Sequence, residues 1–147
     1  MSAYKHILVG LDLNSEESTK VSQKAMEFAV AAGAKLSLVH VVEALALAYA
    51  MDVPTNIESL QKSLRDHATT QMNKILEDLR NKAPNLSIEC EVTVGPTAQQ
   101  LHQLATDRHA DLIIVGSHGR HGLSLIFGST SNDVLHGAEC DVLAVRV

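Results

Sequence analysis

The sequence contains few aromatic residues and no tryptophan, with only two Tyr and two Phe in 147 residues. Proteins that bind single-stranded nucleic acid stack the bases on aromatic rings, so the composition disfavours that class. Basic residues are also scarce: 12 Lys and Arg stand against 17 Asp and Glu, giving a net charge of −5. This charge disfavours general electrostatic binding to nucleic acid and to an anionic membrane surface.

Long hydrophobic runs and cysteine pairs at short spacing are also missing. The most apolar connecting segment, 44–51, is eight residues long, whereas a membrane-spanning helix needs about 20 residues. The first residues lack the pattern of a signal peptide, and Cys90 and Cys140 form no C-x-x-C motif. We therefore expect a cytoplasmic protein without membrane spans, in which the two thiols remain reduced.

Five segments have the character of β-strands. Segments 6–11, 35–42 and 112–115 are short apolar runs rich in branched side chains, typical of strands buried on both faces of a parallel sheet. Segment 86–94 alternates between apolar and polar residues, which predicts an edge strand with one face toward solvent. Segment 141–147 is the last apolar run.

Four helices are predicted between these strands. The first begins at a capping box of Asn14 and Glu17 and ends at Gly33. The second, the longest, begins near Thr55 and ends before Pro84. The third begins at a capping box of Thr97 and Gln100, and the fourth begins near Ser129. The third helix is expected to direct Leu101, Leu104 and Ala105 inward, and the apolar residues of the fourth are Val134, Leu135 and Ala138.

The alternation of strands and helices predicts an α/β fold: one doubly wound parallel sheet with helices on both faces. A chain of this length with 46% hydrophobic residues is expected to form a single domain over residues 1–147. In such a sheet, ligands bind beyond the carboxyl ends of the strands, near the point where strand order reverses.

A glycine-rich loop follows the fourth predicted strand. It starts at Gly116 and leads to the Gly-Ser-Thr-Ser sequence 128–131 at a helix start. Glycines let the backbone approach a ligand closely, and helix N-termini attract anions, so this loop suits phosphate. Neither the P-loop pattern nor G-x-G-x-x-G occurs. From these residues alone, phosphate binding and simple turns remain equally open.

Four segments carry a resemblance to a known family: YKHILVGLD at the start, ADLIIVGSHGRHGL, the following GST, and CDVLAVRV at the end. Together they resemble the universal stress protein family over essentially the whole chain. The resemblance implies a five-stranded sheet of order 3-2-1-4-5, homodimerisation, a cytoplasmic location and, in one subgroup, ATP binding. This strand order would put Cys90, on the third strand, and Cys140, near the fifth, at opposite sheet edges. The binding signature is Gly, two residues, Gly, nine residues, Gly, then Ser, Thr or Asn; here the second spacer, 120–127, has eight residues.

Carried onto this chain, the resemblance implies a nucleotide site for ATP with Mg²⁺. Leu11 and Asp12 at the end of the first strand would face the nucleotide, and Val41 would offer backbone contacts to adenine. The residues expected around ribose and phosphates are Gly116, Gly119, Gly128, Ser129, Thr130 and Ser131.

Other chemical roles have weaker support in the sequence. His118 and His121 lack a Cys or acidic partner for a metal site. His40 lies in a buried-strand pattern and is expected to be a hydrogen-bonded core residue. Ser129 is not part of a G-x-S-x-G elbow, and no catalytic residue is assigned. A phospho-receiver domain is disfavoured because the chain ends Val-Arg-Val without the lysine of that family.

The sequence therefore predicts a stress-response protein that binds ATP as a regulatory ligand, with little or no turnover. Two alternatives remain: a dimeric interaction protein of the same fold that binds no nucleotide, and a slow ATPase. Dimerisation through segment 141–147 is expected because this apolar strand would otherwise leave an open sheet edge. Segment 43–55 is a lid, a partner-binding patch or a packed extra helix. The protein partners are not identified.

Overall fold

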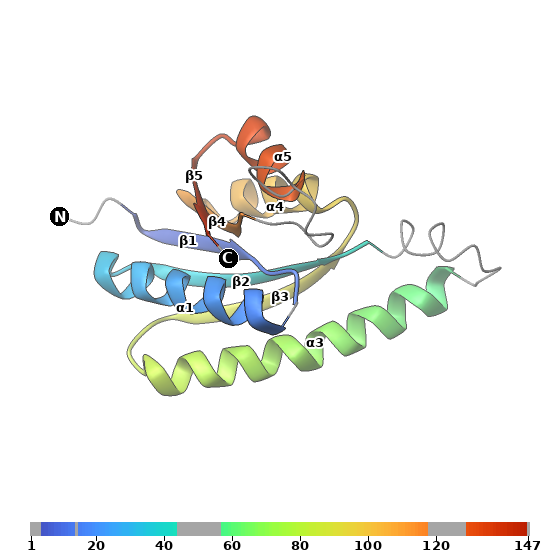
Figure 1. Cartoon of the computed structure of the whole chain (residues 1–147), viewed down its shortest axis with the longest axis horizontal. Helices are drawn as coiled ribbons and strands as arrows, with labels where there is room; N and C mark the ends of the chain where they lie inside the picture. The colour runs from blue at the N-terminus through green and yellow to red at the C-terminus, as the bar shows by residue number, and fades with distance from the viewer. Residues whose placement is uncertain (1–3, 14, 44–56, 118–128, 147) are drawn as a thin grey trace.

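The computed structural model describes residues 4–13, 15–43, 57–117 and 129–146. Over these residues five strands alternate with helices (Figure 1). In chain order the elements are β1 (His6–Gly10), α1 (Ser15–Ala32), β2 (Lys35–Val42), α3 (Ile57–Lys82), β3 (Ile88–Val94), α4 (Thr97–Asp107), β4 (Leu112–Gly116), α5 (Ser129–Gly137) and β5 (Asp141–Val145).

The strands form one parallel sheet of order β3-β2-β1-β4-β5. This confirms the predicted α/β class and strand order. The central strands are the most deeply buried, as their unbroken apolar runs indicated: the first four residues of both β1 and β4 are buried. Strand β3 is an edge strand, as its alternating pattern predicted.

Helices cover both faces of the sheet, with α1 and α3 on one side and α4 and α5 on the other (Figure 1). The alternation of side chains along each strand divides the core accordingly. Ile7 and Leu36 belong to the cluster that packs beneath α1 and α3. Leu8 and Val39 belong to the cluster that contains Leu101 of α4. The sheet is therefore the middle layer of three.

The polar face of β3 is less exposed to solvent than the sequence predicted. Glu89, Glu91 and Thr93 were expected to face solvent, but all three are half-buried. Arg108, just after α4, forms ion pairs with both glutamates, and Thr93 donates a hydrogen bond to Gln100 of α4 at 2.9 Å. The side chains of Gln100 in α4 and of Arg108 after it thus cover this face of β3, although its polar residues alone predicted exposure to solvent.

One prediction about a helix end was wrong. Helix α4 has no Thr97–Gln100 capping box: its N-cap residue is Pro96, which makes no side-chain cap. The Gln100 side chain instead bonds to Thr93. Among the described apolar side chains of α5, Val134 is fully buried and Leu135 is 49% exposed. By contrast, Gly33 adopts the left-handed φ of 66° expected after the end of α1.

A buried polar network crosses three strands on the α4 side of the sheet. The imidazole of His6 bonds through Nε2 to Ser37 Oγ at 2.7 Å, and through Nδ1 to the carbonyl oxygen of Arg108 at 3.0 Å. Ser37 also donates to Glu89 at 3.1 Å, and the Arg108 guanidinium lies 2.9 Å from the same carboxylate. The network ties β1, β2 and β3 to the segment after α4.

This network predicts that stability depends on the charge of Glu89. Burial tends to raise the pKa of its carboxyl, but the Ser37 hydrogen bond and the charges of Lys35 and Arg108 outweigh burial and lower that pKa below its ordinary value. A lowered carboxyl pKa stabilises the fold above the unfolded pKa, and this stability is lost as pH falls through the folded pKa. We expect Glu89→Gln to cost under about 1 kcal/mol near neutral pH, because the carboxylate is partly exposed.

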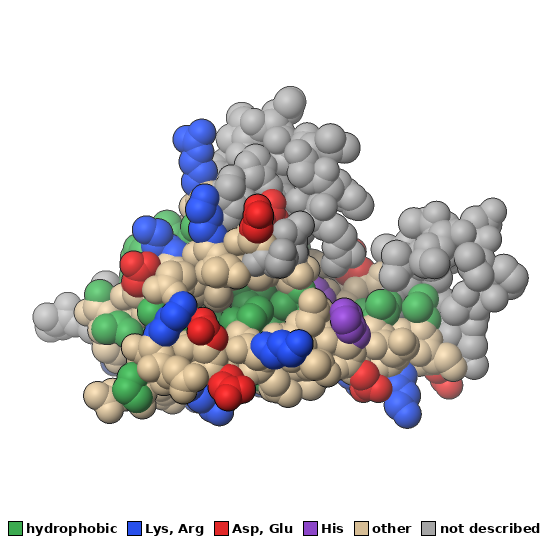
Figure 2. Space-filling view, turned by 60° about the horizontal axis from the view of Figure 1, so that its bottom comes forward, with side chains coloured by type: hydrophobic (Ala, Val, Ile, Leu, Met, Phe, Trp, Pro, Cys, Tyr) green, Lys and Arg blue, Asp and Glu red, His purple; other side chains and the backbone are tan. Residues whose placement is uncertain are grey.

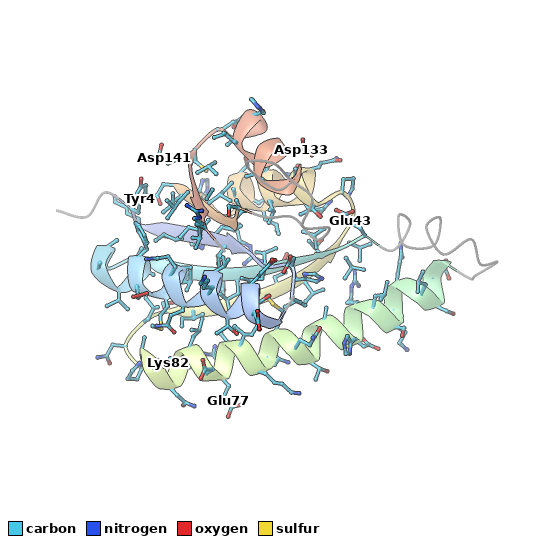
Figure 3. All side chains as sticks on the ribbon, in the orientation of Figure 1. Tyr4, Glu43, Glu77, Lys82, Asp133 and Asp141 are labelled. Atoms are coloured by element: carbon cyan, nitrogen blue, oxygen red, sulfur yellow. The ribbon has the colours of Figure 1, made fainter. Side chains whose placement is uncertain are left out.

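Urea denaturation at a series of pH values measures this contribution. The stability difference between wild type and Glu89→Gln should shrink toward zero as the pH falls below about 4. The control is Glu77→Gln, which removes an exposed carboxylate on α3 (Figure 3). A Glu89→Gln difference that stays constant with pH would show that the charge contributes nothing.

The two cysteines are free and lie where the sequence placed them. Cys90 lies on edge strand β3, and Cys140 immediately precedes β5 at the other edge. Burial raises the pKa of both thiols, and for Cys140 the charges of Asp141, Asp111 and Glu139 raise it further. Neither thiol is therefore activated for nucleophilic chemistry.

Two features of the described residues bear on membranes and surface charge. No described helix is long and apolar enough to cross a membrane. On the face that includes α3, acidic and basic side chains are interspersed (Figure 2). This mixture is consistent with the small negative net charge of −5.

Candidate functional site

Four of the predicted site residues, Leu11, Asp12, Val41 and Gly116, lie together at the carboxyl end of the sheet, where β1 lies between β2 and β4. The register pairs Gly10 with Val39 and Val9 with Ile114. Continued by two residues, it places Asp12 level with Val41 and Leu11 level with Gly116. Three chain segments that are distant in sequence therefore meet at one end of the sheet.

The end of β1 is fixed by hydrogen bonds on both sides of Leu11. The Leu11 amide donates to the Val39 carbonyl at 2.8 Å, and its side chain is 5% exposed. The Leu11 carbonyl accepts a hydrogen bond from His40 Nδ1 at 2.6 Å. Asp12, which comes next, is half-buried. Leu13 then adopts a left-handed φ of 64°, a rare conformation for leucine that turns the chain toward α1.

His40 is a buried, hydrogen-bonded residue, which confirms the interpretation made from its strand pattern. It is 8% exposed, and because a carbonyl oxygen only accepts, Nδ1 must carry the hydrogen that it shares with Leu11. The side chain bridges the carboxyl ends of β1 and β2. His40 therefore positions the residue before Asp12, a role that its sequence pattern did not reveal.

Val41 can contact a ligand only through its backbone. Its side chain is 3% exposed and packs in the cluster on the α4 side of the sheet. Successive residues of a parallel strand direct their backbone polar groups to opposite neighbours. Since the Val39 carbonyl faces β1 and the Val42 carbonyl faces β3, the backbone groups of Val41 face the β1 side, just beyond the end of that strand.

The β4 side of the site begins at Gly116, the last residue of its strand. Ser117 is buried, and its amide donates to the Val145 carbonyl of β5 at 2.7 Å. Gly119 and Gly128, together with His118 and His121, lie outside the described residues. The described chain resumes with α5, whose first turn contains the predicted residues Ser129, Thr130 and Ser131. The N-terminus of such a helix favours anions.

Glu43, directly after β2, caps the N-terminus of α4, a contact that the sequence did not predict. Its Oε1 accepts a hydrogen bond from the Thr97 amide at 3.2 Å and another from the Thr97 hydroxyl. Figure 3 shows Glu43 at the end of β2 on the side of α4. A carboxylate at a helix N-terminus is favoured by the helix dipole. No local signal could have found this pair, because 54 positions separate the two residues.

We expect Glu43→Ala to lower the free energy of unfolding by about 1 kcal/mol, the usual contribution of a side-chain cap. Glu43→Gln keeps an acceptor oxygen and should lose less. Chemical denaturation of the two variants beside wild type measures the effect, with Glu77→Ala on α3 as the control for removing an acidic side chain. If Glu43→Ala is no less stable than Glu77→Ala, Glu43 does not cap α4 in solution.

Among the residues that the structure describes, no group of three or more His, Cys, Asp and Glu side chains could hold a metal ion. The residues at the described strand ends and in the first turn of α5 include one carboxylate near the centre, Asp12, and the capping carboxylate Glu43. The arrangement offers backbone groups, the carboxylate of Asp12 and a helix N-terminus. It is chemically suited to binding a ligand with a polar heterocycle and an anionic group.

Comparisons with known proteins place this geometry in context. The sequence profile of the universal stress protein family matches residues 3–146. Universal stress protein A homolog 2 of Coxiella burnetii is 42% identical over 151 residues, covering 100% of this chain and 98% of that protein. The solved structure of MJ0577, a universal stress protein of Methanocaldococcus jannaschii, superposes with a TM-score of 0.82 at 24% identity, covering 98% and 96% of the two chains.

A second solved structure bears on ligand chemistry. It is a universal stress protein in complex with cAMP, 25% identical to this chain, with a TM-score of 0.66 and coverage of 99% and 98%. An adenine nucleotide is therefore bound by at least one protein that shares this fold.

Proposed function

This chain belongs to the universal stress protein family, and from that premise we propose that it binds ATP with Mg²⁺ as a regulatory ligand, with little or no turnover. The observation that carries the proposal is the convergence of Asp12, Val41 and Gly116 at one end of the sheet, next to the β1–β4 boundary. This is where open α/β sheets bind ligands. The cAMP complex of a relative supports the choice of an adenine nucleotide.

The described residues fit the parts of such a ligand. The backbone of Val41 would hydrogen-bond the adenine edge, and the Asp12 carboxylate would face the ribose hydroxyls or a hydrated Mg²⁺. The glycine at the end of β4 and the N-terminus of α5 would lie beside the phosphates, where Ser129, Thr130 and Ser131 begin the helix. Mg²⁺ supplies charge neutralisation to the phosphates when bound.

Little turnover is proposed because phosphoryl transfer depends on cations placed around the γ-phosphate. In the described part of the site, neither the strand ends nor the first turn of α5 contributes a Lys or Arg. Without such a clamp, developing charge on the phosphoryl group is poorly stabilised. A phosphate release rate above about 1 per second, at the low end of typical enzyme rates, would contradict this part of the proposal.

Mass spectrometry of small molecules released from freshly purified protein tests the proposal without assuming which nucleotide binds. An adenine nucleotide in stoichiometric or near-stoichiometric amount is the expected result. If heat-released extracts contain none, and added ATP is not retained on desalting, the non-binding interaction protein of the same fold replaces the proposal.

Asp12→Ala should weaken ATP binding by roughly tenfold, the effect of losing one charged hydrogen-bonding group. The reason is that Asp12 alone contributes a side-chain carboxylate from the end of β1. Binding is measured by fluorescence anisotropy with a labelled ATP analogue. The matched control is Asp66→Ala, an exposed aspartate on α3. Equal affinities for Asp12→Ala and Asp66→Ala would remove Asp12 from the site.

Self-association through β5 is the second part of the proposal. Strand β5 is an edge strand, and a two-fold pairing of two copies would satisfy both edges. The cytoplasmic location expected from the sequence also belongs to the proposal, and the two free thiols are consistent with it.

A further inference from the structure

We propose that this protein has a second ligand site, a cavity between the C-terminal ends of α4 and α5 that binds a small organic cation with an apolar group. The cavity has a volume of about 590 Å³, within the range of small-molecule sites. Its lining includes Ile113 near the start of β4 and Cys140 just before β5. It therefore lies at the amino end of the sheet, opposite the nucleotide site, and does not depend on nucleotide binding.

The walls of the cavity combine an apolar floor with polar groups. Ala105, Ala110 and Ile113 form an apolar part, while His102 and Thr106 of α4 contribute polar side chains. A ligand with both an apolar body and a polar head matches this mixture. The space is large enough for a single substituted ring or a short branched chain.

The charges around the cavity favour a cation. Thr106 lies in the last turn of α4 and Gly137 is the last residue of α5, so both helices direct their negative ends toward it. Glu139 lines the cavity, and it acts with Asp111 and Asp141 to raise the pKa of the Cys140 thiol beyond the effect of burial.

The described lining of the cavity lacks the positive charge of a Lys or Arg side chain. Arg108, although next to α4, is directed away from the cavity and forms ion pairs with Glu89 and Glu91 of β3. An anion would therefore meet repulsion without a compensating partner, whereas an ammonium or amidinium group would be attracted.

His102 adds an independent observation in the cavity wall. Its Nε2 atom is buried without a hydrogen-bond partner, and a Cβ placed on Gly137 would lie only 2.8 Å from it. Buried polar atoms without partners are uncommon in native proteins. Rotation of the His102 ring by 180° about the Cβ–Cγ bond exchanges the positions of Nε2 and Cε1. Nε2 then points in a different direction, in which a donor group of the ligand would reach it. An ammonium group has only donors, and an unprotonated imidazole nitrogen is an acceptor.

A metal ion is a poorer occupant. His102, His109, Glu139 and Cys140 all line the cavity, yet no three such groups in the described chain come close enough to share an ion. The Cys140 thiol, with its raised pKa, is also a weak ligand near neutral pH. The cavity is thus assigned to an organic cation.

An NMR titration with three probes of one shape tests the assignment: benzylammonium, benzyl alcohol and benzoate. At about pH 8, above the reference histidine pKa of about 6.5, benzylammonium should cause saturable shifts in the amide signals of Thr106 and Cys140. Benzyl alcohol should bind more weakly, and benzoate should cause no saturable shift. Equal binding of benzoate, or no saturable shift with benzylammonium at millimolar concentration, would overturn the proposal.

Two variants locate the probe in the cavity. Glu139→Gln should weaken benzylammonium binding roughly threefold, as expected for an exposed charge pair, while Glu77→Gln on α3 makes the same change in net charge and should have no effect. Ala110→Leu should reduce binding by filling the cavity without changing its charge. If Glu139→Gln and Ala110→Leu both bind like wild type, the probe occupies another site and the proposal fails.

Discussion

Gly128→Val is expected to abolish ATP binding while the protein remains folded. Gly128 closes the glycine pattern that begins at Gly116, and it immediately precedes Ser129, the first residue of α5. Gly128 lies outside the described residues, so the expectation rests on its place beside this helix N-terminus. A β-branched side chain there would occupy the space in which phosphates approach the backbone amides.

Equilibrium dialysis with labelled ATP measures the effect of Gly128→Val. We expect no retained nucleotide at millimolar ATP, and an unchanged circular dichroism spectrum. His118→Ala, a change in the same loop that removes only an imidazole, should alter affinity much less. Wild-type affinity in folded Gly128→Val would exclude the glycine loop as the phosphate site.

Ala144→Pro is expected to convert the proposed dimer into a monomer. The Val145 carbonyl accepts the Ser117 amide at 2.7 Å, so the backbone polar groups of Val145 face β4. Because these groups alternate along a parallel strand, those of Ala144 face the outer edge of β5. Proline at 144 removes the amide hydrogen of this residue. Pairing between β5 and β4 does not use that hydrogen, whereas edge-to-edge pairing between two copies of β5 does.

Light scattering coupled to size-exclusion chromatography distinguishes the two states. Wild type should elute with twice the monomer mass of 15.8 kDa, and Ala144→Pro with the monomer mass at micromolar concentration. Ala144→Thr retains the amide and should remain dimeric, which separates the loss of the hydrogen bond from the change of side chain. A dimeric Ala144→Pro protein would place the interface elsewhere, and a monomeric wild type would remove it.

The sequence predicted the sheet well because its strands are short, apolar and separated by clear helix signals. The five strand segments, the edge position of β3 and the left-handed turn at Gly33 follow from local periodicity and glycine chemistry. The strand order came from the family resemblance. The position of His40 in the core was also predicted, since its neighbours on β2 are apolar.

The errors arose where a distant residue replaced a local partner. Glu43, rather than Gln100, interacts with the start of α4, because tertiary packing brings the end of β2 to that helix. The polar face of β3 is covered by Arg108, which no alternation pattern could indicate. Local propensity and periodicity describe single elements, and these contacts join elements that are far apart in sequence.

The same reasoning applies to the two proposed ligand sites. The position of the proposed carboxyl-end site follows from topology, which brings the strand ends together, and the roles of its residues came from the family resemblance. The cavity between α4 and α5 could not be predicted, because it depends on two helix ends and on an unpartnered nitrogen of His102. In the sequence this residue is only one of eight histidines.

The most direct test of nucleotide binding is a calorimetric titration of wild-type protein with ATP in the presence of Mg²⁺, with GTP as the comparison. We predict a saturable heat for ATP with a stoichiometry of one per chain, and a much weaker response to GTP. A wild-type protein that is folded but gives no saturable heat with ATP at millimolar concentration would contradict the proposed function, and with it the role assigned to the ends of β1, β2 and β4.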